Sequence, residues 1–161
     1  MIFVTIGTQA PFDRLVSAMD EIAALYPEEK FIAQVTNTEL MVENMELRYF
    51  LSPVDFEKLF LEASLIVSHA GMGTIISALT LGKPIIIMPR KAYLNEHRNE
   101  HQLATARKFK DMGYVYVAAD ENELKILMET LHTNGFKSLH RTADSASTEL
   151  ITSIRNFIND K

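Results

Sequence analysis

The sequence contains no cysteine among its 161 residues. A disulfide framework, a thiolate zinc site and a cysteine nucleophile are therefore excluded together, and the composition fits a reducing compartment. Basic residues are not in excess either, because 16 Lys and Arg stand against 21 Asp and Glu and give a net charge of -5. A protein that mainly binds nucleic acid carries a basic patch, so we expect no nucleic-acid partner.

Long hydrophobic runs are also missing. Apolar runs such as residues 65–67 and 85–88 are far below the roughly 18 apolar residues that a membrane-spanning helix needs. The apolar start, residues 1–6, has no basic residues before it and is stopped by Gly7, so it predicts a first strand rather than a signal peptide. Any association with a membrane is therefore expected through a surface or a partner protein.

What is present is an alternation of short β-branched runs with segments of helical period, which is typical of a parallel sheet wrapped by crossover helices. With 47% hydrophobic residues the chain can bury one core, and at about 150 residues per domain we expect a single domain over residues 1–161. The sequence predicts an α/β, Rossmann-like fold, a parallel sheet with helices on both faces. The six expected strands are 1–6, 31–36, 47–51, 65–68, 85–88 and 114–118.

Helices are expected between these strands. Ser52 opens one at about 53–62, and Asp120 caps another that runs to about residue 131. The segment 75–81 is apolar nearly all round, which predicts a helix covered by the sheet on one side and by a further layer on the other.

The last segment, about 147–159, predicts an amphipathic helix. Its apolar stripe consists of Leu150, Ile154, Phe157 and Ile158. Such a stripe needs a surface to cover it. We hypothesise that it docks on a partner protein, and the alternative is that it covers one face of this domain's own sheet.

A glycine-rich turn, residues 68–74 (Ser-His-Ala-Gly-Met-Gly-Thr), lies between an expected buried strand and a helix. Such a turn lets the backbone approach a phosphate while the first amides of the helix point at it. The alternative is that the glycines only allow tight packing of the strand on the helix. The full dinucleotide fingerprint and the P-loop ending are both absent, which disfavours a dinucleotide-binding domain or an NTPase.

A second glycine turn, residues 7–9 (Gly-Thr-Gln), follows the first strand. Ligands of open parallel sheets collect at the carboxyl ends of the strands, and both glycine turns and the turn at Pro89 and Arg90 belong to that edge. The alternative is that Gly7 is only a turn residue and that Asp13 only caps the following helix.

The segment 95–102 is dense in hydrogen-bonding side chains and contains a His-x-x-Glu-His pattern. On one helix, His97 and His101 would share a face and could hold zinc, with Glu100 as the base of a metal-dependent hydrolase. The alternatives are a solvated helix face and a polar wall that binds a sugar.

Taken together, these motifs resemble the nucleotide-sugar-binding half of glycosyltransferase family 28. The similarity is greatest to its small split-enzyme subunits of bacterial exopolysaccharide and capsule synthesis and of dolichol-linked oligosaccharide synthesis. The matching segments are collinear and cover nearly the whole chain: 4–8 with Phe12 and Asp13, 68–74, 82–84, 88–90, and 95–102.

The resemblance implies the C-terminal half of a GT-B glycosyltransferase that binds a UDP-sugar. In this family the glycine turns face the diphosphate, and the resemblance further implies that residues 87–90 lie beside the uracil and that His101 and Gln102 bind the sugar hydroxyls. Relatives often carry a glutamate that binds the ribose hydroxyls where Ser77 stands, and a serine can make one such hydrogen bond. The residues thus assigned to donor binding are Gly7, Thr8, Gln9, Gly71, Met72, Gly73, Thr74, Ser77, Met88, Pro89, Arg90, Glu96, His97, His101 and Gln102.

His69 is the candidate catalytic residue, either as a base for the acceptor hydroxyl or as a structural or phosphate-contacting group. The sequence contains no Asp-x-Asp, which agrees with stabilisation of the leaving diphosphate by protein groups, without a metal or other cofactor. The UDP-sugar would be a substrate.

The resemblance also implies partners. A membrane-anchored acceptor-binding subunit would complete the enzyme and present a lipid-linked saccharide, which would hold this chain at the cytoplasmic, inner face of a membrane. The alternative is a non-catalytic nucleotide-sugar-binding or enhancer subunit of a partner transferase.

Overall fold

The computed structural model describes residues 1–142. The strands are β1 (Ile2–Thr5), β2 (Phe31–Gln34), β3 (Glu46–Arg48), β4 (Leu65–His69), β5 (Ile85–Met88) and β6 (Tyr116–Val117). The helices are α1 (Asp13–Ala23), α2 (Pro53–Glu62), α3 (Met72–Leu81), α4 (His101–Asp111) and α5 (Glu121–Asn134), with a short 3-10 turn, η1, at Ala92–Leu94. Among these helices, none is long and apolar enough to cross a membrane.

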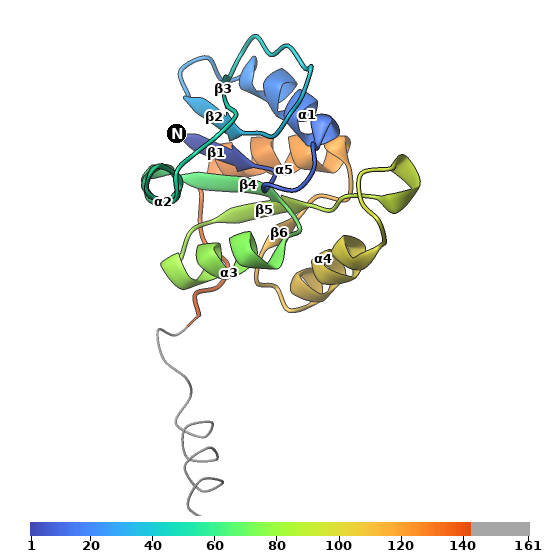
Figure 1. The fold of residues 1–161 in the computed structure, drawn as a ribbon. Helices are drawn as coiled ribbons and strands as arrows, with labels where there is room; N and C mark the ends of the chain where they lie inside the picture. Colours follow the sequence, from blue (N-terminus) through green and yellow to red (C-terminus); the bar gives the residue numbers. More distant parts are fainter. Residues whose placement is uncertain (143–161) are drawn as a thin grey trace, which may run out of the picture.

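All six strands form one parallel sheet in the order β3-β2-β1-β4-β5-β6. Figure 1 shows α1 and α5 on one face of this sheet and α3 and α4 on the other. The predicted Rossmann-like arrangement, with helices on both faces, is therefore confirmed.

The hydrophobic core has two halves, one on each face of the sheet. Strand side chains alternate between them, so that Ile2 and Val4 of β1 pack against α1 and α5, whereas Phe3 packs in the half that includes Phe60 of α2 and Ile75 of α3. Since both faces are covered, β5 is apolar throughout, as its continuous β-branched run predicted, and β1 is buried along its whole length.

The residues predicted to start two of the helices act as expected. The Ser52 hydroxyl accepts a hydrogen bond from the Asp55 amide at 3.1 Å, and the Asp120 carboxylate accepts one from the Glu123 amide at 2.9 Å. Gly82 ends α3 in the left-handed region, with φ of 64°.

Three predictions for individual elements were wrong. The third strand ends at Arg48 instead of residue 51, and the sixth is reduced to Tyr116–Val117. Helix α3 starts at Met72, three residues earlier than expected. Within the described residues Ile76 on this helix is 52% exposed, so the further layer over α3 stays a prediction. The predicted helix over 147–159 and its stripe lie outside the described residues.

Candidate functional site

A cleft of about 950 Å³ opens at the carboxyl ends of β1 and β4. At this point the connections run to opposite sides of the sheet, which is where ligands of open α/β sheets bind. The cleft brings together most of the residues that the sequence indicated: Gly7, Thr8, Gln9, His69, Gly71, Met72, Gly73, Thr74, Arg90, Glu96, His97, His101 and Gln102.

Two backbone turns contribute amide groups to this cleft. The N–H groups of Met72 and Gly73 lie in the first turn of α3, where amides have no intrahelical acceptor. No described side chain caps them either. Within the described residues, the N–H groups of Thr8 and Gln9 in the loop after β1 have no hydrogen-bond acceptor either. The two turns therefore present free donors and the positive end of a helix dipole to an anion.

The imidazole of His69 lies between the two glycine turns. A Cβ on Gly71 would be 2.2 Å from His69 Nε2, and a Cβ on Gly7 would be 2.9 Å from His69 Cε1. Both positions thus need glycine because the ring occupies the space of a side chain, and Gly7 also has a positive φ of 75°. Burial, followed by the charge of Arg90, lowers the pKa of His69 to about 4, so the ring is neutral at pH 7.

A buried hydrogen-bond network fixes the Gly7 turn from beneath. The Thr5 hydroxyl donates to Gln34 Oε1 at 2.7 Å, and Gln34 Nε2 donates to the Gly7 carbonyl at 3.1 Å. The Gly7 amide in turn points at Thr5 Oγ1, 3.4 Å away. Side chains of β1 and β2 therefore set the orientation of the first amide turn.

Arg90 is buried in the wall of the cleft and binds the backbone of the loops around it. It is only 3% exposed, and its two terminal nitrogens donate to four backbone carbonyls, those of Ile6, Ala10, Pro11 and Glu96, at 2.7–3.2 Å. These bonds tie the loop after β1 to the loop after β5. Arg90 lines the cleft, but its terminal donors are committed to shaping it.

Glu96 is held by a residue that sequence reasoning missed, Arg14 of α1. The Arg14 guanidinium donates to both Glu96 carboxylate oxygens, at 2.6 and 2.8 Å, and to Glu121 at 3.2 Å. Burial alone would raise the pKa of Glu96, but the Arg14 hydrogen bond, the Lys91 amide and the neighbouring positive charges outweigh it and lower the pKa. The ionised pair anchors the polar segment between β5 and α4.

That segment and the start of α4 form the polar wall of the cleft. Gln102 Oε1 accepts from the amides of Ala70 at 3.2 Å and Arg90 at 3.1 Å, which leaves its side-chain NH₂ as the group available to a ligand. The imidazole of His97 pairs with the backbone of Asn99, and Asn99 Oδ1 accepts from the His101 amide.

Three predicted residues do not line the cleft. Met88 and Pro89 are buried, and their sulfur and carbonyl oxygen accept hydrogen bonds from Arg14 on the α1 face of the sheet. Ser77 is exposed, one turn further along α3 than Thr74. The zinc alternative also loses its geometry, because α4 starts at His101 and His97 precedes it; in residues 1–142 no group of three potential ligands could hold a metal.

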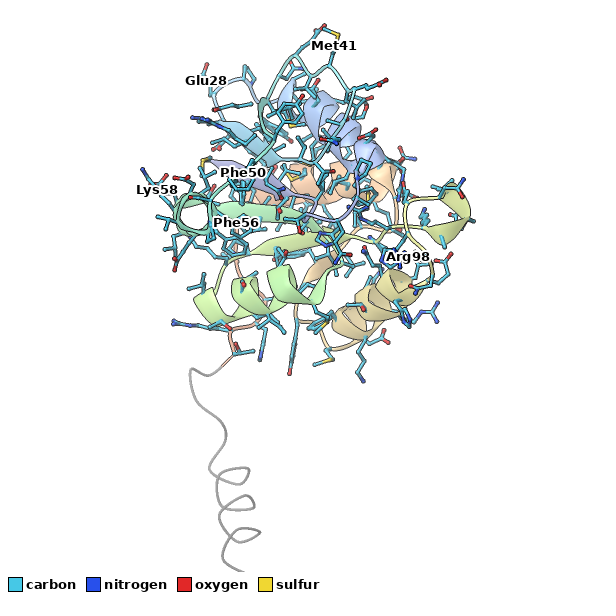
Figure 2. All side chains as sticks on the ribbon, viewed as in Figure 1. Glu28, Met41, Phe50, Phe56, Lys58 and Arg98 are labelled. Carbon is cyan, nitrogen blue, oxygen red and sulfur yellow. The ribbon has the colours of Figure 1, made fainter. Side chains whose placement is uncertain are left out.

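A second cleft of about 810 Å³ adjoins the first and was not anticipated. The two clefts share Gly7, Thr8, Gln9 and Thr74, and the second extends towards α2. Its remaining walls include Gln34, Asn37, Tyr49, Phe50, Leu51, Pro53 and Phe56. Figure 2 shows Phe50 and Phe56 beside α2, and Arg98 of the first cleft on the side of α4.

Comparison with known proteins decides the family. The profile of the glycosyltransferase family 28 C-terminal domain matches residues 1–156. The chain belongs to this family. Its membership confirms the resemblance carried by the glycine turns and by the polar segment 95–102.

Individual members of family 28 support the same assignment. A UDP-N-acetylglucosamine transferase subunit ALG13 of Eremothecium gossypii is 34% identical over 120 residues, 73% of this chain and 57% of that protein. A UDP-N-acetylglucosamine--N-acetylmuramyl-(pentapeptide) pyrophosphoryl-undecaprenol N-acetylglucosamine transferase of Bacteroides fragilis is 32% identical over 79 residues, 49% of this chain and 20% of that enzyme. The chain thus spans less than two thirds of either relative.

Solved structures confirm the fold expected for family 28. An NMR structure of ALG13 matches with a TM-score of 0.58 and 21% identity, over 95% of this chain and 93% of that one. At this identity the match shows a shared fold, the Rossmann-like C-terminal half of a GT-B glycosyltransferase.

Proposed function

We propose that this chain is the donor-binding catalytic subunit of a split glycosyltransferase that transfers a sugar from a UDP-sugar to a lipid-linked acceptor. The observation that carries the proposal is the pair of amide turns, at Thr8 with Gln9 and at Met72 with Gly73, in the cleft at the carboxyl edge of the sheet. The ALG13 relatives, named as UDP-N-acetylglucosamine transferase subunits, favour N-acetylglucosamine as the sugar.

The chemistry follows from where negative charge grows. In glycosyl transfer, the bond from the anomeric carbon to the diphosphate breaks, and its electron pair stays on the diphosphate oxygen. Amides and a helix N-terminus fixed around that oxygen stabilise the transition state more than the ground state. The helix dipole contributes about 0.3–1 kcal/mol to this effect.

The two clefts suggest how the donor lies. The residues common to both, Gly7, Thr8, Gln9 and Thr74, would hold the diphosphate. The nucleoside would enter the second cleft, because its aromatic and aliphatic walls suit a flat base, and the sugar would lie in the first, against the polar wall of 97–102. This differs from the expectation that residues 87–90 contact the base, since Met88 and Pro89 are buried and point elsewhere.

The partner in this proposal is a membrane-anchored subunit that carries the lipid-linked saccharide acceptor. It would complete the enzyme across the open side of the two clefts and hold this chain at the cytoplasmic face of the membrane. The proposal is supported by the name of the ALG13 relative, which calls it a transferase subunit.

The test is a thermal-shift titration with UDP-N-acetylglucosamine, UDP, uridine and pyrophosphate. A ligand at about 100 times its Kd stabilises the fold by about 2.7 kcal/mol, which corresponds to a rise in Tm of roughly 5–10 °C. We expect this rise with UDP-N-acetylglucosamine and UDP, and weaker effects from uridine or pyrophosphate alone. No shift with any uridine ligand would contradict the proposal.

A second experiment separates a catalytic from an enhancer role. A Cβ on Gly73 would meet no atom within 4 Å, so variants there fold, yet a large side chain would fill the cleft. In the reconstituted complex with its partner, Gly73→Phe should abolish sugar transfer, whereas Gly73→Ala should retain most of it. Transfer that survives Gly73→Phe would identify an enhancer.

A further inference from the structure

The Nε2–Cε1 edge of His69 faces the place where the two amide turns would hold an anion. Nε2 lies 2.2 Å from the Cβ position of Gly71, directly before the first turn of α3, and Cε1 lies 2.9 Å from that of Gly7. His69 also lines the first cleft. An anionic oxygen bound by both turns therefore comes against this edge of the ring.

The hydrogen bonds on the other side of the ring fix where its proton sits. The Ser68 hydroxyl donates to the Thr5 carbonyl at 3.0 Å, and the same oxygen is 3.2 Å from His69 Nδ1. Because a hydroxyl has a single proton, and this one is given to Thr5, the Ser68 oxygen accepts from Nδ1–H. The neutral ring therefore carries its lone pair on Nε2.

The surroundings of His69 keep the ligand-free ring neutral. The charged and titratable groups that face it are Arg90, from the end of β5, and His97, from the segment before α4. Both lower its pKa in addition to burial, and together these effects outweigh a hydrogen bond with the Thr5 backbone that raises it. Glu96 also lines the cleft, but its carboxylate is neutralised by Arg14. The glycine turns contribute only backbone.

We propose that binding of a nucleoside diphosphate sugar is coupled to the uptake of one proton by His69, which then donates from Nε2 to a diphosphate oxygen. A bare lone pair facing an anionic oxygen is repulsive, whereas an imidazolium there makes a charge-assisted hydrogen bond. The inference rests on the proposed function, and it assigns His69 to the leaving diphosphate rather than to the acceptor hydroxyl.

The coupling has a defined pH dependence. The anionic diphosphate raises the pKa of His69 in the complex above its value of about 4 in the free chain. Protons are therefore taken up on binding between these two pKa values. Affinity falls by up to about tenfold per pH unit as the pH rises above the pKa of the complex.

The test is isothermal titration calorimetry with UDP-N-acetylglucosamine at about pH 6, in two buffers of different ionisation enthalpy. This ligand is suitable because its diphosphate is esterified at both ends and does not titrate in this range, unlike the terminal phosphate of UDP. We expect uptake of roughly 0.5–1 proton by the wild type, nearly none by His69→Gln, and an unchanged value for His132→Gln, which alters a histidine outside both clefts. The change of wild-type affinity with pH, measured from pH 5 to pH 8, gives the number of protons taken up in a second way. This number must agree with the calorimetric one, and the comparison requires no variant.

Binding without proton uptake would overturn the inference and indicate that the ring changes tautomer instead, with the Ser68 hydroxyl turning to Nδ1. Uptake that persists in His69→Gln would also overturn it. Absence of any binding by the wild type would contradict the proposed function itself and would remove the basis for this inference.

Discussion

Arg14 and Glu96 lie 82 positions apart in the sequence, yet the guanidinium of one donates to both carboxylate oxygens of the other. Both side chains are largely buried, with exposures of 14% and 12%. The pair joins α1 to the segment that carries His97 and leads into α4. The polar wall of the cleft is thus anchored on the opposite face of the sheet from α4.

Replacing Arg14 should therefore affect the fold and the site together. Arg14→Met leaves the Glu96 carboxylate without its main partner, and an uncompensated, largely buried charge is costly. We expect a loss of about 2–4 kcal/mol in the free energy of unfolding, measured by urea denaturation at pH 7. In the double variant with Glu96→Gln, part of this loss should be restored, and a simple sum of the two single losses would refute the pairing.

Acid should destabilise the protein in two steps. Unfolded His69 binds a proton near pH 6.5, but the folded ring does so only near pH 4, so stability falls as the pH drops between these values. Glu96 has a lowered pKa, so its contribution is present above the usual value of about 4.3 and is lost as the pH falls through the lower folded value. Urea unfolding at a series of pH values should show the upper step missing in His69→Gln and the lower one reduced in Glu96→Gln.

The two glycines that begin α3 should respond oppositely to the same change. Gly71→Ala places a Cβ 2.2 Å from His69 Nε2 and must displace the ring, at a cost of about 1–3 kcal/mol and at least a tenfold loss of UDP affinity. Gly73→Ala meets no atom within 4 Å and lies in the first helical turn, so stability should rise slightly or stay unchanged. Equal effects in melting and binding experiments would contradict the placement of His69.

Arg90 should be intolerant of even a conservative change. Lysine has no planar fork with which to hold four carbonyls, so Arg90→Lys should lower the stability by about 3 kcal/mol and the Tm by roughly 6–12 °C. Arg98→Lys is the matched control, because Arg98 lines the same cleft but is exposed. Its Tm should remain within about 2 °C of the wild type.

A side chain of the second cleft should affect ligand affinity but not the stability of the fold. Phe50 is 85% exposed, so Phe50→Ala should change the free energy of unfolding by less than about 0.5 kcal/mol. If the base of the donor contacts this ring, affinity for UDP should fall by about fivefold or more. Val54→Ala, which alters an equally apolar and 74% exposed side chain outside both clefts, should leave affinity unchanged.

The arrangement of strands and the glycine turns were predictable because they depend on local signals. Alternating strands and helices fix a parallel sheet, and right-handed crossovers leave few orders for its strands. Glycines placed where a strand passes into a helix then mark the carboxyl edge of that sheet. Gly7, Gly71 and Gly73 could therefore be assigned to one cleft without any structure.

The aromatic residues of the second cleft could not be found in this way. Tyr49 and Phe50 have strong strand propensity and were read as part of the third strand, but β3 is an edge strand that ends at Arg48. Beyond it, no neighbouring strand offers hydrogen bonds, and both rings are exposed instead. Strand propensity describes how well a side chain fits a pleated surface, so it does not predict the residue at which an edge strand ends.

Arg14 was missed, and the burial of Arg90 was not foreseen, for a different reason. A charged residue in an amphipathic helix or a turn is usually solvated, and nothing in the sequence near Arg14 or Arg90 indicates burial. Their partners lie 74–107 and 6–84 positions away, respectively, so only the folded chain brings them together. The sequence identified the loops of the site and Arg90, but not that Arg90 and Arg14 hold these loops in place.

Because a single guanidinium, that of Arg90, secures the loop after β1 and the loop after β5 at once, the two loops cannot be exchanged separately. Consider a chimera that receives only the 90–101 segment of a relative, made in order to change its ligand specificity. Its own residues 6–11 would still place their carbonyls for the native Arg90 and not for the residue that replaces it. Transplanting both segments together, with Phe12 packed beneath the guanidiniums of Arg14 and Arg90 at 5.3 and 4.9 Å, keeps the first cleft as one exchangeable unit.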